Sequence, residues 1–183
     1  TVLMAGRLTP WKGQHVLIKA LQELPQAHAI FLGDALFTEE DRQYARELRE
    51  TAAQPPLAGR VHFAGFRKDT AAFFDLADVV VHASVIAEPF GRVIVEGMLA
   101  GKPVIATRAG GAAEILTHEQ TGLFVSPNHA QALAAAGGED ERAQARAGHG
   151  DGAGGDTGSG RDDLRRSRRP GRRTGRPGPG HWS

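Results

Sequence analysis

The sequence predicts an α/β fold, a doubly wound parallel sheet, followed by a disordered tail. Two observations predict the sheet: from residue 2 to about residue 136, short apolar runs alternate with longer amphipathic segments, and glycine follows most of the apolar runs. Strands and helices that alternate in this way form βαβ units and a parallel sheet. A third observation predicts the tail, because large apolar side chains almost disappear beyond residue 136.

Six apolar runs are the predicted strands. Each is short and consists mainly of aliphatic, β-branched or aromatic residues, as in a strand that is buried within a sheet. Glycine stands at or near the end of the first three, where the chain must turn toward a helix. The predicted strands cover residues 2–6, 29–34, 60–66, 79–81, 104–107 and 123–125.

Amphipathic segments follow the predicted strands. Residues 16–24 carry apolar side chains at helical spacing and stop at Pro25. Residues 38–53 begin with a pattern similar to a capping box, and Asp69 is expected to cap a third, short helix. Further helices are predicted from Pro89 to Ala100, around residues 114–116 and from about Asn128.

The stretch from Ala87 to Glu96 carries two carboxylates. Glu88 and Glu96 are separated by seven residues. Pro89 is expected just inside the start of a helix, where its missing N–H costs nothing, and Gly91 leaves room for a ligand to approach the backbone. A helix N-terminus suits a phosphate, and ionised carboxylates suit sugar or ribose hydroxyls. This stretch is therefore the centre of the candidate site.

Other polar residues and glycines follow the strands in the same way. The carboxyl ends of parallel strands share one edge of the sheet, where ligands bind. Two cations in the loop after the first strand are suited to bind a diphosphate and to stabilise the charge left on it when a bond to phosphate breaks. The residues expected at this edge are Arg7, Lys12, Gly33, Asp34, Gly65, Phe66, Ser84, Glu88, Gly110 and Gly111.

Two further side chains are weaker candidates. Phe66 and Arg67 are suited to form the wall of a base-binding site, although a phenylalanine alone is more often part of a core. His82, at the end of the fourth strand, is interpreted as structural, because no order of Ser, His and Asp supports nucleophilic catalysis.

Absent patterns exclude several classes of protein. The sequence has no cysteine, no metal-ligand spacing, and neither G-x-G-x-x-G nor a P-loop pattern after the first strand. No apolar run is long enough to span a bilayer, and no signal peptide opens the chain, which starts inside a predicted strand as a fragment would. A disulfide framework, a dinucleotide dehydrogenase and a P-loop NTPase are therefore not expected.

Charge is divided unevenly along the chain. Residues 1–136 carry a net charge of −2 and residues 137–183 a net charge of +3. The first part offers no electrostatic basis for binding nucleic acid. The second part is interpreted as a low-complexity, Gly/Arg-rich tail that is either disordered or the product of a frameshift in GC-rich DNA; a real basic arm is the alternative.

Six motifs occur in order along residues 2–136. They are Gly6-Arg7-Leu8 with Lys12-Gly13, Gly33-Asp34, Val61-His62-Phe63-Ala64-Gly65, Glu88-Pro89-Phe90-Gly91 with Glu96, Gly101-Lys102-Pro103-Val104 and Gly110-Gly111-Ala112-Ala113-Glu114. Taken together they resemble the C-terminal, donor-binding domain of the GT-B glycosyltransferases, specifically the retaining group-1 (GT4-type) family. The resemblance implies that residues 1–136 form the Rossmann-like donor half of a GT-B enzyme, incomplete at its C-terminus.

The resemblance implies a role for each matching residue. Arg7 and Lys12 correspond to the basic pair on the donor diphosphate, Glu88 to the glutamate that holds hydroxyls of the transferred sugar, and Glu96 to the glutamate that binds the ribose. The implied catalytic residues are Arg7, Lys12 and Glu88, and the implied donor-binding residues are Gly33, Asp34, Gly65, Phe66, Arg67, Pro89, Phe90, Gly91, Arg92, Val93 and Glu96.

The resemblance also implies a reaction and its partners. Such an enzyme transfers a hexose from a nucleotide diphosphate sugar to an acceptor with retention at the anomeric carbon, without a cofactor or a metal, in the cytoplasm. The implied partners are the nucleotide-sugar donor and an acceptor-binding N-terminal domain that this sequence lacks. No nucleic acid is expected, and membrane association only through the missing half. The fragment alone is expected to be inactive.

Two alternatives remain open from the sequence. One is a GT-B sugar-nucleotide epimerase or phosphorylase-like enzyme, which would act without an acceptor. The other is a non-catalytic nucleotide-binding domain whose basic tail is real.

Overall fold

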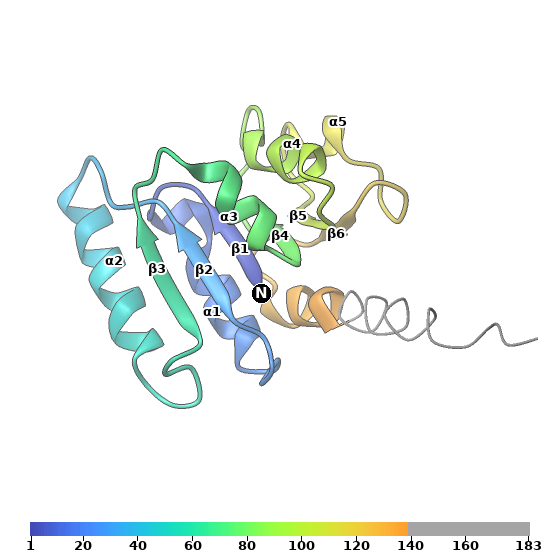
Figure 1. Cartoon of the computed structure of the whole chain (residues 1–183). Helices are drawn as coiled ribbons and strands as arrows, with labels where there is room; N and C mark the ends of the chain where they lie inside the picture. Colours follow the sequence, from blue (N-terminus) through green and yellow to red (C-terminus); the bar gives the residue numbers. More distant parts are fainter. Residues whose placement is uncertain (139–183) are drawn as a thin grey trace, which may run out of the picture. The chain divides into compact units, whose positions relative to one another are not determined.

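The computed structural model of the chain describes residues 1–138, whose arrangement is shown in Figure 1. The predicted tail falls outside these described residues except for its first two positions. Within residues 1–138, no helix is both long enough and apolar enough to cross a membrane.

A six-stranded parallel sheet lies at the centre of this domain, with the strand order β3-β2-β1-β4-β5-β6. This is the strand order of the doubly wound Rossmann fold. The predicted fold class and all six predicted strands are confirmed. The strands are β1 (Val2–Ala5), β2 (Ala29–Leu32), β3 (Val61–Gly65), β4 (Val79–His82), β5 (Val104–Thr107) and β6 (Leu123–Val125).

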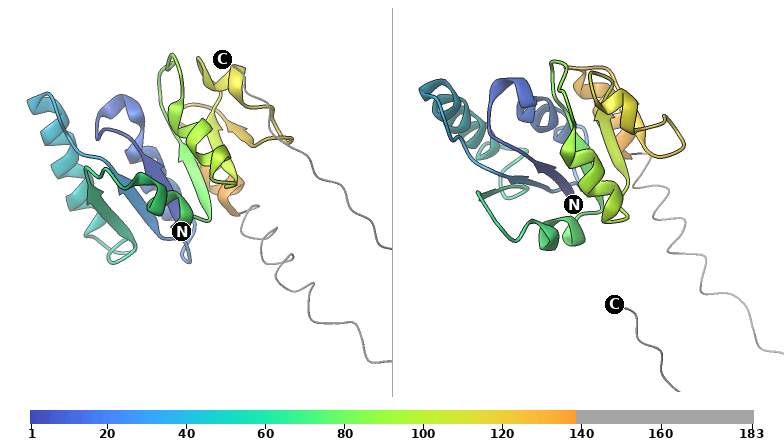
Figure 2. Two further views of the ribbon diagram at one scale, coloured as in Figure 1. Left: turned by 45° about the horizontal axis from the view of Figure 1, so that its top comes forward. Right: turned by 90° about the horizontal axis from the view of Figure 1, so that it is seen from above.

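Helices cover both faces of the sheet, as Figure 2 shows. One face packs against α1, α2 and a last helix that begins at Ala130 and continues to residue 138, and the other face packs against α3, α4 and α5. The helices are α1 (Gln14–Leu21), α2 (Glu39–Ala52), α3 (Thr70–Leu76), α4 (Arg92–Leu99) and α5 (Ala112–Ile115), with a short 3-10 helix η1 (Pro10–Lys12) before α1.

Two hydrophobic cores result, one on each side of the sheet. Successive side chains on a strand point to opposite faces. Val2 and Met4 of β1 therefore pack in the core that α1 and α2 cover, whereas Leu3 packs with Phe74 of α3 and Ile94 of α4. Because both faces are buried, β1 and β2 are apolar at every position, and β4 and β5 carry a polar residue only at their last position, His82 and Thr107. This is why the sequence shows continuous apolar runs rather than alternation.

The N-terminus of α2 is capped as the sequence predicts. Thr38 Oγ1 accepts a hydrogen bond of 3.0 Å from the backbone N–H of Asp41. We expect Thr38→Ala to lower the free energy of unfolding by about 1 kcal/mol, as measured by urea denaturation. Thr38→Ser keeps the hydroxyl, and its free energy of unfolding should stay close to that of the unchanged protein. An equal loss of free energy of unfolding in both variants would contradict a capping role.

Two predicted helix starts are wrong in detail. Asp69 occupies the position before α3, but its carboxylate accepts two hydrogen bonds from Arg67 instead of capping the helix. Pro89 precedes α4 rather than lying in its first turn, because α4 begins at Arg92. Gly91, with a φ of 59°, makes the left-handed turn into the helix, a conformation that glycine adopts at little cost.

Candidate functional site

A hollow of about 410 Å³ lies where the loops that follow β1, β2, β3 and β4 meet. β1 and β4 are neighbours in the sheet, but the helices that follow them cover opposite faces, so the chain diverges there and leaves a crevice. The residues that the resemblance assigns to catalysis or donor binding all line this hollow, except Gly65 and Gly91; Ser84, Gly110 and Gly111, also expected at this edge, do not line it. Those that line it are Arg7, Lys12, Gly33, Asp34, Phe66, Arg67, Glu88, Pro89, Phe90, Arg92, Val93 and Glu96.

The two cations of the first loop lie against the same aromatic ring. The Lys12 ammonium is 4.5 Å from the centre of a Trp11 ring, and the Arg7 guanidinium is 5.6 Å from Trp11 and 5.0 Å from Phe37. Cation–π contacts of this kind hold a charged group in place without neutralising it. The backbone of Trp11 is also held in place, because its carbonyl accepts a hydrogen bond from the Val85 N–H.

Glu88 lies at the centre of a polar cluster at the edge of the hollow. Its Oε1 accepts a hydrogen bond from the Lys12 ammonium. Its Oε2 lies 2.7 Å from His82 Nε2 and accepts a 2.8 Å hydrogen bond from the Ser84 hydroxyl. The Glu88 and Lys12 side chains are only 15% and 13% exposed, so this ion pair is largely removed from water.

These donors keep Glu88 ionised. Burial raises the pKa of the Glu88 carboxyl, but the hydrogen bonds from His82, Lys12 and Ser84 and the charge of Lys12 outweigh burial and lower the pKa from 4.5 to about 2. Glu88 is therefore a permanent hydrogen-bond acceptor at neutral pH. This charge state suits the binding of hydroxyl groups and does not suit proton donation.

The two glycines after β5 hold the backbone of Glu88 in place. The Gly111 N–H donates to the Glu88 carbonyl at 2.8 Å, and Glu88 and Gly110 form a parallel bridge. A Cβ at Gly110 would lie 2.3 Å from the backbone carbonyl oxygen of Glu88, and one at Gly111 would lie 2.4 Å from the backbone carbonyl oxygen of Pro89. Only glycine lets the two loops approach this closely.

We expect Gly110→Ala to lower the free energy of unfolding by about 3 kcal/mol, since it combines a collision with the Glu88 backbone and strain at a φ of +58°. Gly101→Ala is the matched control, because Gly101 has a φ of +68° with open space around it, and it should cost only about 1–2 kcal/mol. Urea denaturation of both variants measures the difference. Equal losses would show that the close contact has no energetic weight.

The start of α4 faces the same hollow. No side chain caps this helix. The Ile94 N–H donates to the Gly91 carbonyl at 2.9 Å, and helix geometry leaves the N–H groups of Arg92 and Val93 without an intrahelical acceptor. Arg92 and Val93, in that turn, line the hollow, and Phe90 beside them is 75% exposed. Glu96 lies one turn further on, and its Oε1 is 3.5 Å from the Arg92 guanidinium. A free helix start next to an exposed carboxylate is suited to bind an anion and a hydroxyl side by side.

Phe66 and Arg67 lie on the other side of the hollow, after β3. Phe66 is 64% exposed and so is not part of either core. Arg67 forms a two-pronged ion pair with Asp69, which holds the pKa of the Asp69 carboxyl at about 2, and its guanidinium lies 5.4 Å from the Phe73 ring. An exposed ring beside a guanidinium held by an ion pair is suited to contact a planar base.

Sequence reasoning did not assign His82 or Trp11 to the site, although it placed Ser84 at this edge of the sheet. His82 was interpreted as structural, but it contacts Glu88 together with Ser84, and Trp11 carries both cations. For His82 a signal existed, since it ends β4 two positions before Ser84, and alternate positions of an extended chain share a face. Trp11 gave no comparable signal.

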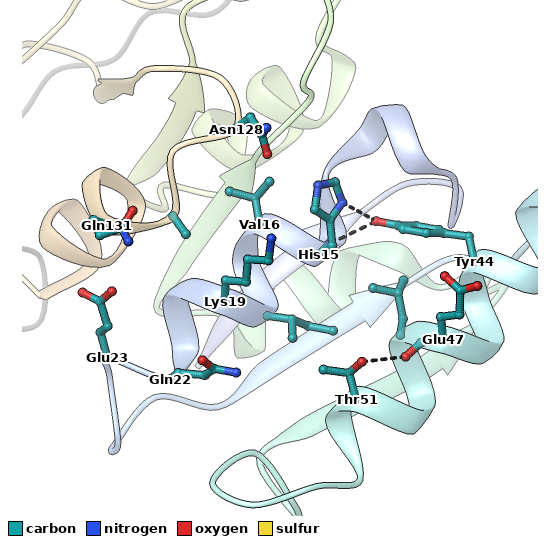
Figure 3. Close-up of a pocket in the computed structure, with 13 residues that line it drawn as sticks. His15, Val16, Lys19, Gln22, Glu23, Tyr44, Glu47, Thr51, Asn128 and Gln131 are labelled. Atoms are coloured by element: carbon teal, nitrogen blue, oxygen red, sulfur yellow. Dashed lines mark hydrogen bonds between the residues drawn. The ribbon is translucent and has the colours of Figure 1, made fainter.

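A larger hollow, of about 650 Å³, lies between α1, α2 and the segment around Asn128 (Figure 3). The Tyr44 hydroxyl and His15 Nδ1 are 2.9 Å apart there. Burial raises the pKa of Tyr44 to about 12, and burial together with the charge of Lys19 lowers the pKa of His15, so both groups are neutral at pH 7. None of the predicted site residues lines this hollow, and we assign the candidate site to the smaller one.

The parallel sheet, the crevice at its carboxyl edge and the glutamate pair define the donor-side, Rossmann-like half of a GT-B glycosyltransferase. Residues 1–137 match the family model described as glycosyl transferases group 1, and the chain belongs to this family. The putative glycosyltransferase YtcC of Bacillus subtilis is 39% identical over 131 residues, which are 68% of this chain and 32% of YtcC. The lipopolysaccharide core biosynthesis glycosyltransferase LpsE of Rhizobium meliloti is 36% identical over 135 residues, covering 74% of this chain and 37% of LpsE.

Solved structures agree with this assignment. Anabaena Alr3699/HepE in complex with UDP-glucose is 46% identical with a TM-score of 0.73, and the match covers 78% of this chain and 40% of that one. The C-terminal domain of the group 1 family protein LpcC from Francisella tularensis is 28% identical with a TM-score of 0.65, covering 80% of this chain and 75% of that domain. The resemblance to the C-terminal domain of the family is confirmed. The chain spans about a third of the length of the curated relatives it matches.

Proposed function

We propose that this domain binds a nucleotide diphosphate sugar in the hollow at the carboxyl ends of β1 to β4. One observation carries the proposal: residues from four separate loops, predicted individually to bind parts of one donor, line a single hollow. The diphosphate lies between the cations of the first loop and the free start of α4. Glu88 binds the sugar, Glu96 binds the ribose, and Phe66 with Arg67 forms the wall for the base.

The structural neighbours support the choice of ligand. HepE structures contain UDP, UDP with glucose, and UDP-glucose, and they are 43% to 47% identical to this chain over the matched region. The residues that line the hollow all lie within residues 1–137, the part of the chain that matches the family model. A uridine nucleotide is therefore the probe of choice for this domain.

The proposed reaction is the transfer of a hexose from this donor to an acceptor with retention at the anomeric carbon. Charge accumulates on the diphosphate as the glycosidic bond breaks, and Arg7 and Lys12 are placed to stabilise it without a metal. The acceptor site belongs to the part of the enzyme that this chain does not include. We therefore propose that the domain binds donor in the cytoplasm and that transfer requires an N-terminal acceptor-binding domain.

Calorimetric titration of the chain with UDP and with UMP tests the proposed function. We expect UDP to bind with a dissociation constant in the micromolar to millimolar range. UMP, which lacks the second phosphate, should bind at least about ten-fold more weakly, because it loses charge-assisted hydrogen bonds to the loop cations. Equal affinity for both would contradict the diphosphate assignment, and no binding of either would overturn the proposed function.

A further inference from the structure

His82 is a buried histidine with one ring nitrogen in use. Its side chain is 4% exposed, and Nε2 lies 2.7 Å from Glu88 Oε2. Its other ring nitrogen, Nδ1, is buried and has no hydrogen-bond partner among residues 1–138. In the proposed donor site, His82 has no assigned role.

The two ring nitrogens fix the protonation state of His82. The Glu88 carboxylate is ionised and can only accept, so His82 Nε2 must carry the proton that it donates. A second proton on Nδ1 would leave a buried N–H without an acceptor, which is costly. These contacts favour the tautomer of His82 that carries its proton on Nε2 and donates it to Glu88.

This donation limits what Glu88 can bind. Oε2 receives His82 and Ser84, so both of its in-plane lone pairs are occupied. Among residues 1–138, Oε1 receives a hydrogen bond only from Lys12 and keeps one acceptor position, and Glu88 lines the hollow. Two donors, His82 at the end of β4 and Ser84 just after it, hold Oε2 and restrain rotation of the carboxylate, which leaves the one position on Oε1 for a ligand.

We propose that His82 is a positioning residue which, with Ser84, locks the Glu88 carboxylate so that its Oε1 accepts a single hydroxyl of the donor sugar. This inference rests on the proposed function. It goes beyond it in naming the residue that orients Glu88 and in limiting Glu88 to one sugar hydroxyl. His82 does not touch the donor, and Glu88 transmits its effect.

The test compares affinities for UDP-glucose and UDP in the unchanged chain and in two variants, by calorimetry. His82→Leu removes the hydrogen-bond donor to Glu88 and keeps an apolar side chain of similar size. It should lower the affinity for UDP-glucose about ten-fold relative to the affinity for UDP, because Glu88 loses a charge-assisted hydrogen bond and turns away from the sugar. UDP itself should bind within about two-fold of the unchanged chain. His82→Gln, whose amide nitrogen reaches the place of Nε2, should recover most of the UDP-glucose affinity.

A purely structural role gives a different pattern. If His82 only fills space, His82→Leu will leave the ratio of the two affinities unchanged, or weaken UDP and UDP-glucose alike, and either result overturns the inference while the proposed function stands. If the unchanged chain binds neither nucleotide, the proposed function fails and the inference with it.

A measurement on the unchanged chain does not depend on any variant folding. Long-range ¹H–¹⁵N NMR correlations distinguish the two neutral tautomers of a histidine, and His82 should show a protonated Nε2 and a bare Nδ1. A proton on Nδ1 would overturn the inference, because His82 then has no hydrogen to donate to Glu88 from Nε2.

Discussion

Replacing Arg7 and Lys12 together with alanine is expected to abolish detectable binding of UDP. Both cations line the hollow beside Trp11, and in the proposed complex each contributes charge-assisted hydrogen bonds to the diphosphate. Each such bond contributes about 1.5–3 kcal/mol, so the loss of two corresponds to at least about a hundred-fold in affinity. Calorimetric titration of the double variant with UDP measures this loss.

The matched control removes the same charge elsewhere. Lys19→Ala with Arg46→Ala takes away two exposed cations that do not line the site, and this variant should bind UDP as the unchanged chain does. Lys12→Ala leaves Glu88 without its ion-pair partner. Circular dichroism of both double variants is therefore needed, and it should show that both remain folded. If both double variants bind UDP equally well, Arg7 and Lys12 do not bind the diphosphate.

Glu88→Gln is expected to remove a pH dependence from the stability of the domain. The pKa of Glu88 falls from 4.5 to about 2 on folding. The ionised carboxylate therefore stabilises the fold fully above pH 4.5, and this contribution is lost as the pH falls toward 2. A shift of this size corresponds to about 3 kcal/mol, of which more than half is lost by pH 3.

Urea denaturation at several values between pH 6 and pH 3 measures this effect. The free energy of unfolding of the unchanged chain should fall more steeply than that of Glu88→Gln, which cannot titrate at this position and is less stable at pH 6. Asp69 also has a pKa of about 2 but is exposed, and it contributes equally to both curves. Parallel curves would show that Glu88 is not held ionised by its neighbours.

The sheet was predictable because its information is local. The apolar runs around Leu3, Phe31 and Val80 form strands buried on both faces, and the Thr38 cap needs only the next three residues. The alternation also predicts parallel βαβ units that wind in one hand, whereas the strand order comes from the structure. The predictable features use contacts between neighbours in sequence or periodicity along one element.

The arrangement around Glu88 was predictable only in part. The positions of Arg7 and Lys12 at the hollow follow from the rule that loops after parallel strands meet at one edge. The bonds from His82 and Ser84 to Glu88 do not follow from any rule on sequence. They depend on the path of the loop after β4, which is set by the close contact with Gly110 and Gly111, far along the chain.

Pro89 shows the same limit at the start of a helix. A proline followed by a helical pattern is most often in the first turn, so the sequence places α4 too early. The backbone bridge between Glu88 and Gly110 holds this segment against another loop, and the helix cannot begin until Gly91 has turned the chain. The start of α4 is therefore set by tertiary contacts and not by the local preference of proline for the first turn of a helix.

Glu88 and Glu96 consequently differ in environment as well as in proposed role. Glu88 is 15% exposed and held by three donors, whereas Glu96 is 40% exposed, with the Arg92 guanidinium 3.5 Å away. A rigid carboxylate suits the sugar, whose orientation sets the geometry of transfer, and an adaptable one suits the ribose, which only needs to be held. In the proposed complex, the pair binds two parts of one donor and does not act as acid and base on the same atom.

A crystal structure of the chain with bound UDP tests the central proposal most directly. The diphosphate should lie between the Arg7 and Lys12 side chains and the start of α4, with a ribose hydroxyl on Glu96 and the base against Phe66. A nucleotide bound instead in the larger hollow between α1 and α2, beside His15 and Tyr44, would contradict the proposed donor site.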